Sequence, residues 1–212
     1  MNAACLERPA GPNYLVYREN VSYRRLRRVI DIGFTALAMV FAVPILAAAA
    51  LAIKLEDGGP VFFVQRRVGR FGRLFDVYKL RTMKIEACGD APSPTASGDA
   101  RITRIGAFLR RTSIDELPQF FNVIRGDMAL VGPRPEQPFL VRTYDAPWQQ
   151  LRHLVKPGIT CLWQIRCRSQ IPLHLPAATV HDVEYIERAS TVTDASIVCG
   201  TIRALLSSQG AY

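Results

Sequence analysis

The feature that most constrains this chain is an uncharged apolar run from Ile32 to Ile53, which contains a proline near its middle. As a straight helix, its 22 residues would extend roughly 33 Å at about 1.5 Å per residue. That length is enough to cross a bilayer hydrocarbon core of roughly 30 Å. A helix in a soluble core is rarely this apolar on every side. The sequence therefore predicts a helix that inserts into a membrane.

Both flanks of this run are basic. The sequence YRRLRR precedes it at 23–28, and Lys54 and four arginines between 66 and 73 follow it. Basic residues beside a membrane segment favour the cytoplasm, so both ends prefer the same side. Pro44 removes a helical hydrogen bond and kinks or breaks the helix. These features favour a re-entrant helix that is broken at Pro44 and leaves the membrane on the side it entered. A kinked single-pass helix is the alternative.

The composition of the chain points to an anionic partner. Its 212 residues carry a formal net charge of +9, and 49% of them are hydrophobic, which suits the core of one domain. A charge of this sign suits nucleic acid, acidic lipid or a phosphorylated substrate. The five cysteines are scattered without a CxxC motif. Reduced thiols are therefore expected rather than a zinc site or a disulfide framework.

After the apolar run, the chain alternates between strand and helix patterns. Residues 61–69 and 74–83 have the composition of short strands, whereas 86–100 is rich in Gly, Pro, Ser and Ala and is expected to be a mobile surface loop. Residues 101–111 gather four apolar side chains on one helical face among arginines: Ile102, Ile105, Phe108 and Leu109. Such a helix either lies on a membrane surface or packs on the core.

The remaining patterns complete an α+β prediction. Residues 117–126 suggest an amphipathic helix ended by Gly126, 156–166 a turn followed by a strand, and 194–208 a helix capped by Asp194. We therefore expect an N-terminal tail at 1–22, and a basic flank with the re-entrant helix at 23–55. A compact domain with amphipathic interfacial helices is expected at 56–212.

An acidic pair stands out in this basic chain. Asp115 and Glu116 lie in the sequence RRTSIDELPQ, and Pro118 is tolerated in a helix only in its first turn. The pair is therefore expected at a helix start, where Ser113 and Glu116 could form a capping box and the helix dipole favours negative charge. On this stretch alone, capping is a sufficient explanation of the two acids.

The basic residues elsewhere suggest chemistry for the pair. Arg110 precedes it, and Arg134 follows in GPRP, where Pro135 restricts the arginine to an extended backbone. A stiffened arginine loses less entropy when its guanidinium binds phosphate oxygens. Lys79 is a further candidate cation. In such surroundings a carboxylate could hold Mg²⁺ together with substrate phosphates, or could attack a phosphorus atom.

A long ordered segment carries a family resemblance. The sequence DARITRIGAFLRRTSIDELPQFFNVIRGDMALVGPRPE at 99–136 resembles the signature of the bacterial sugar transferases, the monotopic phosphoglycosyltransferases. Further matching segments bring the resemblance to most of the chain from about residue 25 onward: 58–83, 152–160, 182–190 and the terminal TIRALLSSQGAY.

The resemblance implies a specific activity. Family members transfer a sugar-1-phosphate from a UDP-sugar to undecaprenyl phosphate in a ping-pong reaction that needs Mg²⁺ and releases UMP, which initiates the assembly of exopolysaccharide, capsule or O-antigen. By similarity, Asp115 is the nucleophile and Glu116 binds Mg²⁺, while Arg110, Arg134 and Lys79 lie at the substrate phosphates. The resemblance also implies a catalytic domain on the cytoplasmic face of the bacterial inner membrane, anchored by a helix broken at Pro44.

Some positions depart from the family pattern. Val43 stands where a serine is usual before the membrane proline, Cys161 stands where glycine is usual, and 167–181 matches poorly. These departures leave open a non-catalytic, membrane-associated scaffold or regulator. A nucleic-acid binder is suggested by charge alone, and the sequence contains no recognised module for it, so no nucleic-acid partner is expected. The identity of the sugar and the oligomeric state are not predicted.

Overall fold

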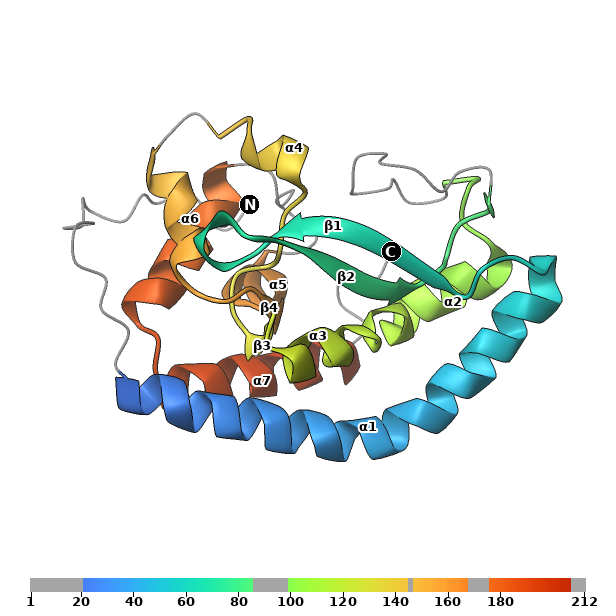
Figure 1. The fold of residues 1–212 in the computed structure, drawn as a ribbon, viewed down its shortest axis with the longest axis horizontal. Coiled ribbons are helices and arrows are strands. Elements are labelled where there is room, and N and C mark those ends of the chain that lie inside the picture. The colour runs from blue at the N-terminus through green and yellow to red at the C-terminus, as the bar shows by residue number, and fades with distance from the viewer. Residues whose placement is uncertain (1–20, 86–98, 145–146, 168–175, 207–212) are drawn as a thin grey trace.

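The computed structural model describes residues 21–85, 99–144, 147–167 and 176–206. Most of the expected tail at 1–22, most of the expected mobile loop at 86–100, and residues 168–175 of the divergent segment lie outside the described residues. The described part combines helices with two small two-stranded sheets, which agrees with the expected mixture of helix and strand (Figure 1).

Helix α1 (Val21–Asp57) runs along one side of the molecule (Figure 1). It is long and apolar enough to cross a membrane, and it is the one such helix among the described residues. The chain remains helical through Pro44, and α1 is curved (Figure 1), so the predicted break at this residue is not seen. Proline removes one backbone donor, but the intact hydrogen bonds of the neighbouring turns hold the helix together.

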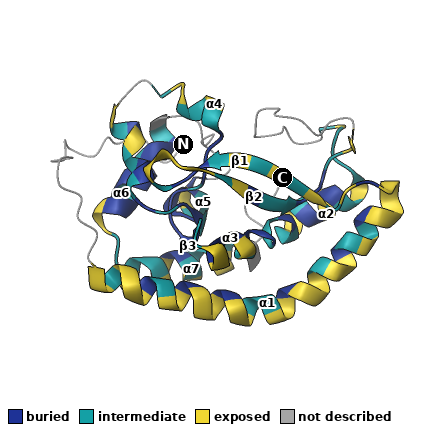
Figure 2. Cartoon of the chain, viewed as in Figure 1, coloured by how far each residue is buried: buried dark blue, intermediate teal, exposed yellow. Residues whose placement is uncertain are grey.

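The exposed face of α1 is apolar, whereas its buried face carries polar groups. Figure 2 shows exposed residues along most of the outer side of the helix. The buried side includes Arg27, Asp31 and Thr35. Large apolar side chains are exposed along the whole helix, among them Phe34, Leu37, Val40, Phe41, Val43 and Leu51. An apolar surface of this extent is unusual for a soluble monomer and suits contact with lipid.

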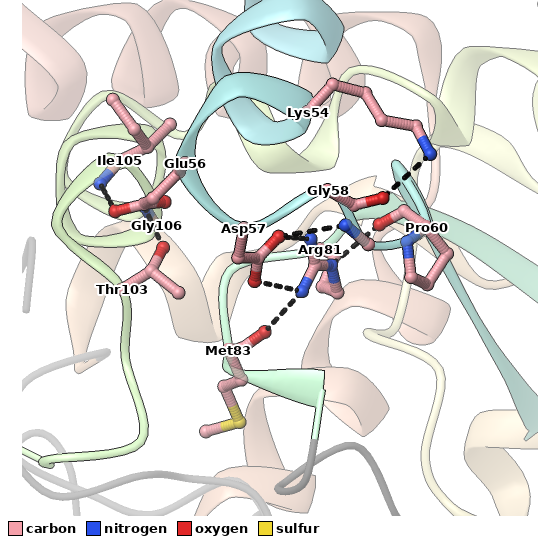
Figure 3. A network of polar contacts seen from close by, with 11 residues as sticks. Lys54, Glu56, Asp57, Gly58, Pro60, Arg81, Met83, Thr103, Ile105 and Gly106 are labelled. Atoms are coloured by element: carbon pink, nitrogen blue, oxygen red, sulfur yellow. Dashed lines mark hydrogen bonds and ion pairs between the residues drawn. The ribbon is translucent and has the colours of Figure 1, made fainter.

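The C-terminal end of α1 is held by Arg81, which directly follows the second strand of the chain (Figure 3). Both carboxylate oxygens of Asp57 accept hydrogen bonds from the guanidinium of Arg81, one of them at 2.6 Å from Nη1 to Oδ2. Arg81 is buried, and its Nε also donates to the carbonyl of Pro60 at 2.6 Å. The helix end and the end of β2 (Leu74–Leu80) are therefore held together by a bidentate ion pair.

The first sheet is an antiparallel hairpin of β1 (Phe62–Val68) and β2 (Leu74–Leu80), as the strand patterns predicted. A short 3₁₀ helix, η3 (Arg70–Gly72), connects the strands. Phe63 pairs with Lys79 and Arg67 with Phe75, so these four side chains lie on one face of the hairpin.

Helices α2 (Arg104–Thr112) and α3 (Gln119–Arg125) flank the 3₁₀ helix η5 (Ile114–Glu116). Thr103 caps α2 by accepting from the Gly106 amide, and Gly126 ends α3 in the left-handed conformation. On α2, Leu109 is buried against the core while Phe108 is exposed, so the helix both packs inward and presents an apolar side chain outward.

The second sheet is a parallel pair of β3 (Ala129–Val131) and β4 (Gly158–Thr160). The predicted strand beyond Thr160 is wrong, since the chain turns there into the short helix α5 (Leu162–Arg166). The main core cluster covers this sheet with side chains such as Leu130, Val155, Tyr185 and Ile197. The other elements around it are α4 (Pro138–Val141), the 3₁₀ helix η6 (Pro147–Leu154), α6 (Pro176–Glu187) and α7 (Thr191–Leu206).

The predicted cap of the last helix is also wrong. Helix α7 begins at Thr191, and the hydroxyl of Ser190 accepts from the Thr193 amide at 3.2 Å. The carboxylate of Asp194 instead accepts from the hydroxyls of Tyr23 and Tyr185 at 2.7 and 2.8 Å. Asp194 therefore links α7 to the start of α1 and to α6.

Candidate active site

The acidic pair lies in η5, between α2 and α3, rather than in a capping box. Ser113 makes no side-chain hydrogen bond to the turn that follows, and the residue before α3 is Pro118, which has no capping side chain. The carboxylate of Glu116 instead faces two cations. It accepts from Nζ of Lys79 at 2.9 Å and from both terminal nitrogens of Arg134, one of them at 3.3 Å.

These partners come from distant parts of the chain. Lys79 is the penultimate residue of β2, and Arg134 follows β3 in the turn that contains two prolines. The structure therefore brings Lys79, Glu116 and Arg134, all named from the sequence, into direct contact. Lys79 and Arg134 hold the pKa of Glu116 well below its ordinary value, although burial acts in the opposite direction.

Asp115 is placed differently from its neighbour. Its side chain is buried, and among the described residues none donates a hydrogen bond to its carboxylate or forms an ion pair with it. Burial is the largest cause that raises the pKa of Asp115, to about 6, and the negative charge of Glu116 acts in the same direction. Asp115 therefore combines a raised pKa with a carboxylate that has no hydrogen-bond or ion-pair partner among the described residues.

Arg110 approaches the pair from α2. Its Nε donates to the hydroxyl of Thr82 at 2.8 Å, and its charge lowers the pKa of Asp115. Thr82 follows β2 and is fixed by α2, because its carbonyl accepts from the Thr103 amide at 3.1 Å. Gly106 permits this close approach, since a Cβ at that position would lie 2.1 Å from the carbonyl oxygen of Thr82.

A fourth cation, Arg67, was missed in the sequence. It lies on the same face of the hairpin as Lys79 and is close enough to Arg134 and Glu116 for their charges to affect its pKa, which burial lowers to about 10. Its guanidinium donates to the carbonyl of Pro135 at 3.1 Å and to the Gln65 side chain. No carboxylate within the described residues forms an ion pair with it. Alternation along β1 places Arg67 on the same face as Phe63, the partner of Lys79, and would have identified it.

A buried network of ion pairs contacts the backbone of Arg134. Nη2 of Arg152 donates to the carbonyl of Arg134 at 2.8 Å and pairs with Asp182 at 2.9 Å. Glu136 lies 3.9 Å from the same guanidinium, and all three side chains are nearly inaccessible. Burial and the charge of Glu136 raise the pKa of Asp182 to about 6, with burial the larger cause. The network fixes the backbone of the turn that carries Arg134.

The site is electropositive overall. Among the described residues, its four basic side chains (Lys79, Arg67, Arg110 and Arg134) outnumber the carboxylates of Asp115 and Glu116 by two charges, and Glu136 near Arg67 offsets one of these. A phosphate-containing ligand would balance that excess, and in a partly buried setting the attraction is stronger than in water.

The donor chemistry also fits Mg²⁺. No group of three or more histidine, cysteine or acidic side chains occurs in the described part of the chain, so these residues offer no complete cage. Magnesium prefers one or two carboxylates together with phosphate oxygens and water. Asp115 and Glu116 supply two such carboxylates.

Within the described part of the chain, the other positions singled out from the sequence make no hydrogen bond or ion pair with the acidic pair, although Cys161 lies near enough to Arg134 for the charge of the arginine to affect the pKa of its thiol. Val43 and Pro44 are on the exposed face of α1. Cys161 follows β4 and is buried with Trp163 and Cys167, and this burial raises the pKa of its thiol to about 12.

Comparison with known proteins gives consistent matches. A family model described as bacterial sugar transferase matches residues 22–208. The chain is 40% identical over 210 residues to the UDP-glucose:undecaprenyl-phosphate glucose-1-phosphate transferase of Caulobacter vibrioides, which covers 97% of this chain and 77% of that protein. It is also 40% identical over 199 residues to the UDP-N-acetylgalactosamine-undecaprenyl-phosphate N-acetylgalactosaminephosphotransferase of Aeromonas hydrophila, covering 89% of this chain but 45% of that protein.

A third relative is the UDP-glucose:undecaprenyl-phosphate glucose-1-phosphate transferase of Escherichia coli, which is 39% identical over 188 residues. That match covers 84% of this chain and 40% of the relative. The chain thus spans less than half of two of these relatives and about three-quarters of the Caulobacter protein.

Proposed function

Because the chain belongs to the bacterial sugar transferase family, we propose that it transfers a sugar-1-phosphate from a UDP-sugar to undecaprenyl phosphate and so initiates the assembly of a polysaccharide such as an exopolysaccharide. The names of its relatives support the donor and acceptor classes. They differ in the sugar, so the proposal names the class of donor only.

The observation that carries this proposal is the uncommitted carboxylate of Asp115 among surplus cations. Asp115 is the nucleophile, and a carboxylate oxygen attacks the phosphorus that bears the sugar. The bond from that phosphorus to the bridging oxygen breaks, and UMP leaves. A phosphate oxygen of undecaprenyl phosphate then attacks the same phosphorus and restores the free carboxylate.

The cations solve the main difficulty of this chemistry, which is the repulsion between two anions. Arg110, Arg134, Lys79 and Arg67 bind and neutralise the phosphate oxygens, so that a carboxylate can approach. Glu116 holds Arg134 and Lys79 in place. Glu116 and Asp115 would hold Mg²⁺ together with the substrate phosphates, and the ion would supply additional positive charge there.

The proposal is tested by the intact mass of the protein after mixing with single UDP-sugars and Mg²⁺, without the lipid acceptor. The wild type should gain the mass of one phosphosugar and release UMP, and added undecaprenyl phosphate should discharge the adduct. Asp115→Asn should form no adduct, whereas Asp76→Asn, an exposed carboxylate on the hairpin, should behave as the wild type. UMP release that persists undiminished in Asp115→Asn would exclude Asp115 as the nucleophile.

We further propose that α1 is re-entrant and holds the domain on the cytoplasmic face of the inner membrane. The basic residues at both ends of α1 and its apolar exposed face support this topology. Pro44 favours a bend there. Single cysteines placed at Ser22 and Leu55 should be labelled from the same side of sealed vesicles by a reagent that does not cross membranes. Labelling from opposite sides would indicate a spanning helix.

A further inference from the structure

The membrane helix contacts the backbone of a strand that leads to the active site. Oδ1 of Asp31 accepts a hydrogen bond from the Leu130 amide at 3.2 Å, and the guanidinium of Arg27 donates to the carbonyl of Val131. All four residues are buried. Among the described residues β3 pairs with β4 alone, and the Leu130 amide, on the edge away from β4, finds its acceptor in Asp31 instead of in a neighbouring strand.

Arg27 and Asp31 are unusual because they are buried polar residues on a largely apolar helix. An apolar helix alone would be sufficient for membrane attachment, and burying ionised groups without partners is costly. Arg27 has its counter-ion in Asp194, 3.5 Å away. Asp31 makes its hydrogen bond to the strand itself. Hydrogen bonds that fix two consecutive residues of β3 specify the position of the strand more closely than apolar packing does.

Only a short segment connects β3 to Arg134 of the catalytic cluster. Arg134 comes three residues after Val131, and the turn between them is fastened to the β4 region at two points. The Gly132 amide donates to the carbonyl of Thr160, and the Gly158 amide donates to the carbonyl of Pro133, both at 2.9 Å. A shift of β3 would therefore move the backbone of Arg134, whose guanidinium binds Glu116.

From this geometry we propose that Asp31 and Arg27 are positioning residues of the active site. They hold β3 so that Arg134 reaches Glu116 and the substrate phosphates, and the docking of α1 thereby sets the catalytic geometry. This inference rests on the proposed function for its kinetic test, and the backbone contact itself is tested separately.

The kinetic test uses the full-length protein in lipid nanodiscs, with UMP release from a UDP-sugar as the readout. Asp31→Ala removes the acceptor for the Leu130 amide and should lower kcat by about tenfold to a hundredfold, since a misplacement of about 1 Å costs on the order of 100-fold. Asp31→Asn keeps an acceptor oxygen and should retain most of the rate. Thr35→Val, a nearly isosteric change at a buried position on the same face of α1, should leave the rate unchanged.

A double-mutant cycle separates positioning from general stability. In an Arg134→Lys background, Asp31→Ala should have little further effect on kcat, because the group it positions is already altered. Arg27→Lys keeps the charge beside Asp194 but is too short for the bond to Val131, and it should show the same dependence on Arg134. This variant serves as the test if Asp31→Ala does not fold. Full additivity with Arg134→Lys, or equal losses in Asp31→Asn and Asp31→Ala, would overturn the proposal.

Hydrogen exchange provides a readout that does not depend on turnover. Asp31→Ala should increase amide exchange at residues 129–136, whereas Thr35→Val should not. Unchanged exchange in Asp31→Ala would refute the inference, even if the wild type is active. Absence of turnover in the wild type, together with increased exchange in Asp31→Ala, would instead refute the proposed function and leave the structural coupling in place.

Discussion

The substitution Asp115→Asn should remove the proposed chemistry and yet stabilise the fold. Folding raises the pKa of Asp115 from 3.8 to about 6, chiefly by burial, so the ionised carboxylate destabilises the folded state. A shift of about two units at about 1.4 kcal/mol per unit gives up to about 3 kcal/mol. For a chain of this size, that difference corresponds to a rise in Tm on the order of 5–10 °C.

The pH dependence of this effect has a definite sign. Above about pH 6 the wild-type carboxylate is ionised in both states, and the full destabilisation is present. As the pH falls through 6 toward 3.8, the folded protein binds the proton first, and the penalty disappears. The advantage of Asp115→Asn should therefore be complete at pH 8 and small at pH 4.

Thermal melting in nanodiscs without Mg²⁺ measures the effect, with Asp76→Asn as the surface control. The adjacent change, Glu116→Gln, should act in the opposite direction, because it leaves Lys79 and Arg134 buried without their shared carboxylate. Loss of one partner of a buried ion pair costs about 3–5 kcal/mol. A lower Tm for Asp115→Asn, or an advantage that is the same at pH 4 and pH 8, would refute this account of the site.

Three further predictions concern the same cluster. The rate of phosphosugar adduct formation should fall about tenfold between pH 7 and pH 5, because Asp115 must be ionised to attack; a rate that is flat over this range would argue against its raised pKa. Arg67→Gln should lower kcat/KM for the UDP-sugar by at least about tenfold. Its control is Arg66→Gln, which changes a largely exposed arginine on the other face of β1 and should alter kcat/KM less than about twofold. Equal effects of the two substitutions would exclude a specific role for Arg67. Gly106→Ala should lower the Tm and slow adduct formation, since the new methyl group would clash with the carbonyl of Thr82; an unchanged Tm would show that α2 adapts.

Local patterns predicted much of the fold. The strands at 62–68 and 74–80 and the end of α3 at Gly126 follow from composition, alternation and glycine conformation. The acidic pair and three of its cations were also apparent from residue type and family resemblance. For the strands and the helix end, the signal lies within a few residues of the feature it predicts, whereas Lys79 is distant in sequence from Glu116 and was named from its type and the resemblance.

Features that depend on distant contacts could not be predicted in this way. The pairing of β3 with β4 joins segments nearly thirty residues apart, and nothing local indicates that the strand stops at Thr160. Asp194 resembles a helix cap, but the tyrosines that it binds come from α1 and α6. Arg27 resembles any basic flank of a membrane segment until the strand beneath it is known. These residues are determined by tertiary partners, which sequence periodicity does not encode.

The attachment of α1 at both ends has a practical consequence for work with this protein. The bidentate pair of Asp57 and Arg81 holds one end, and the polar contacts of Arg27 and Asp31 hold the other. A truncation that begins after Asp57 would expose the edge of β3 and leave the buried guanidinium of Arg81 without its carboxylate. The helix is therefore an integral part of the folded domain, and a chimaera that borrows the anchor of a relative should carry over these polar residues as well.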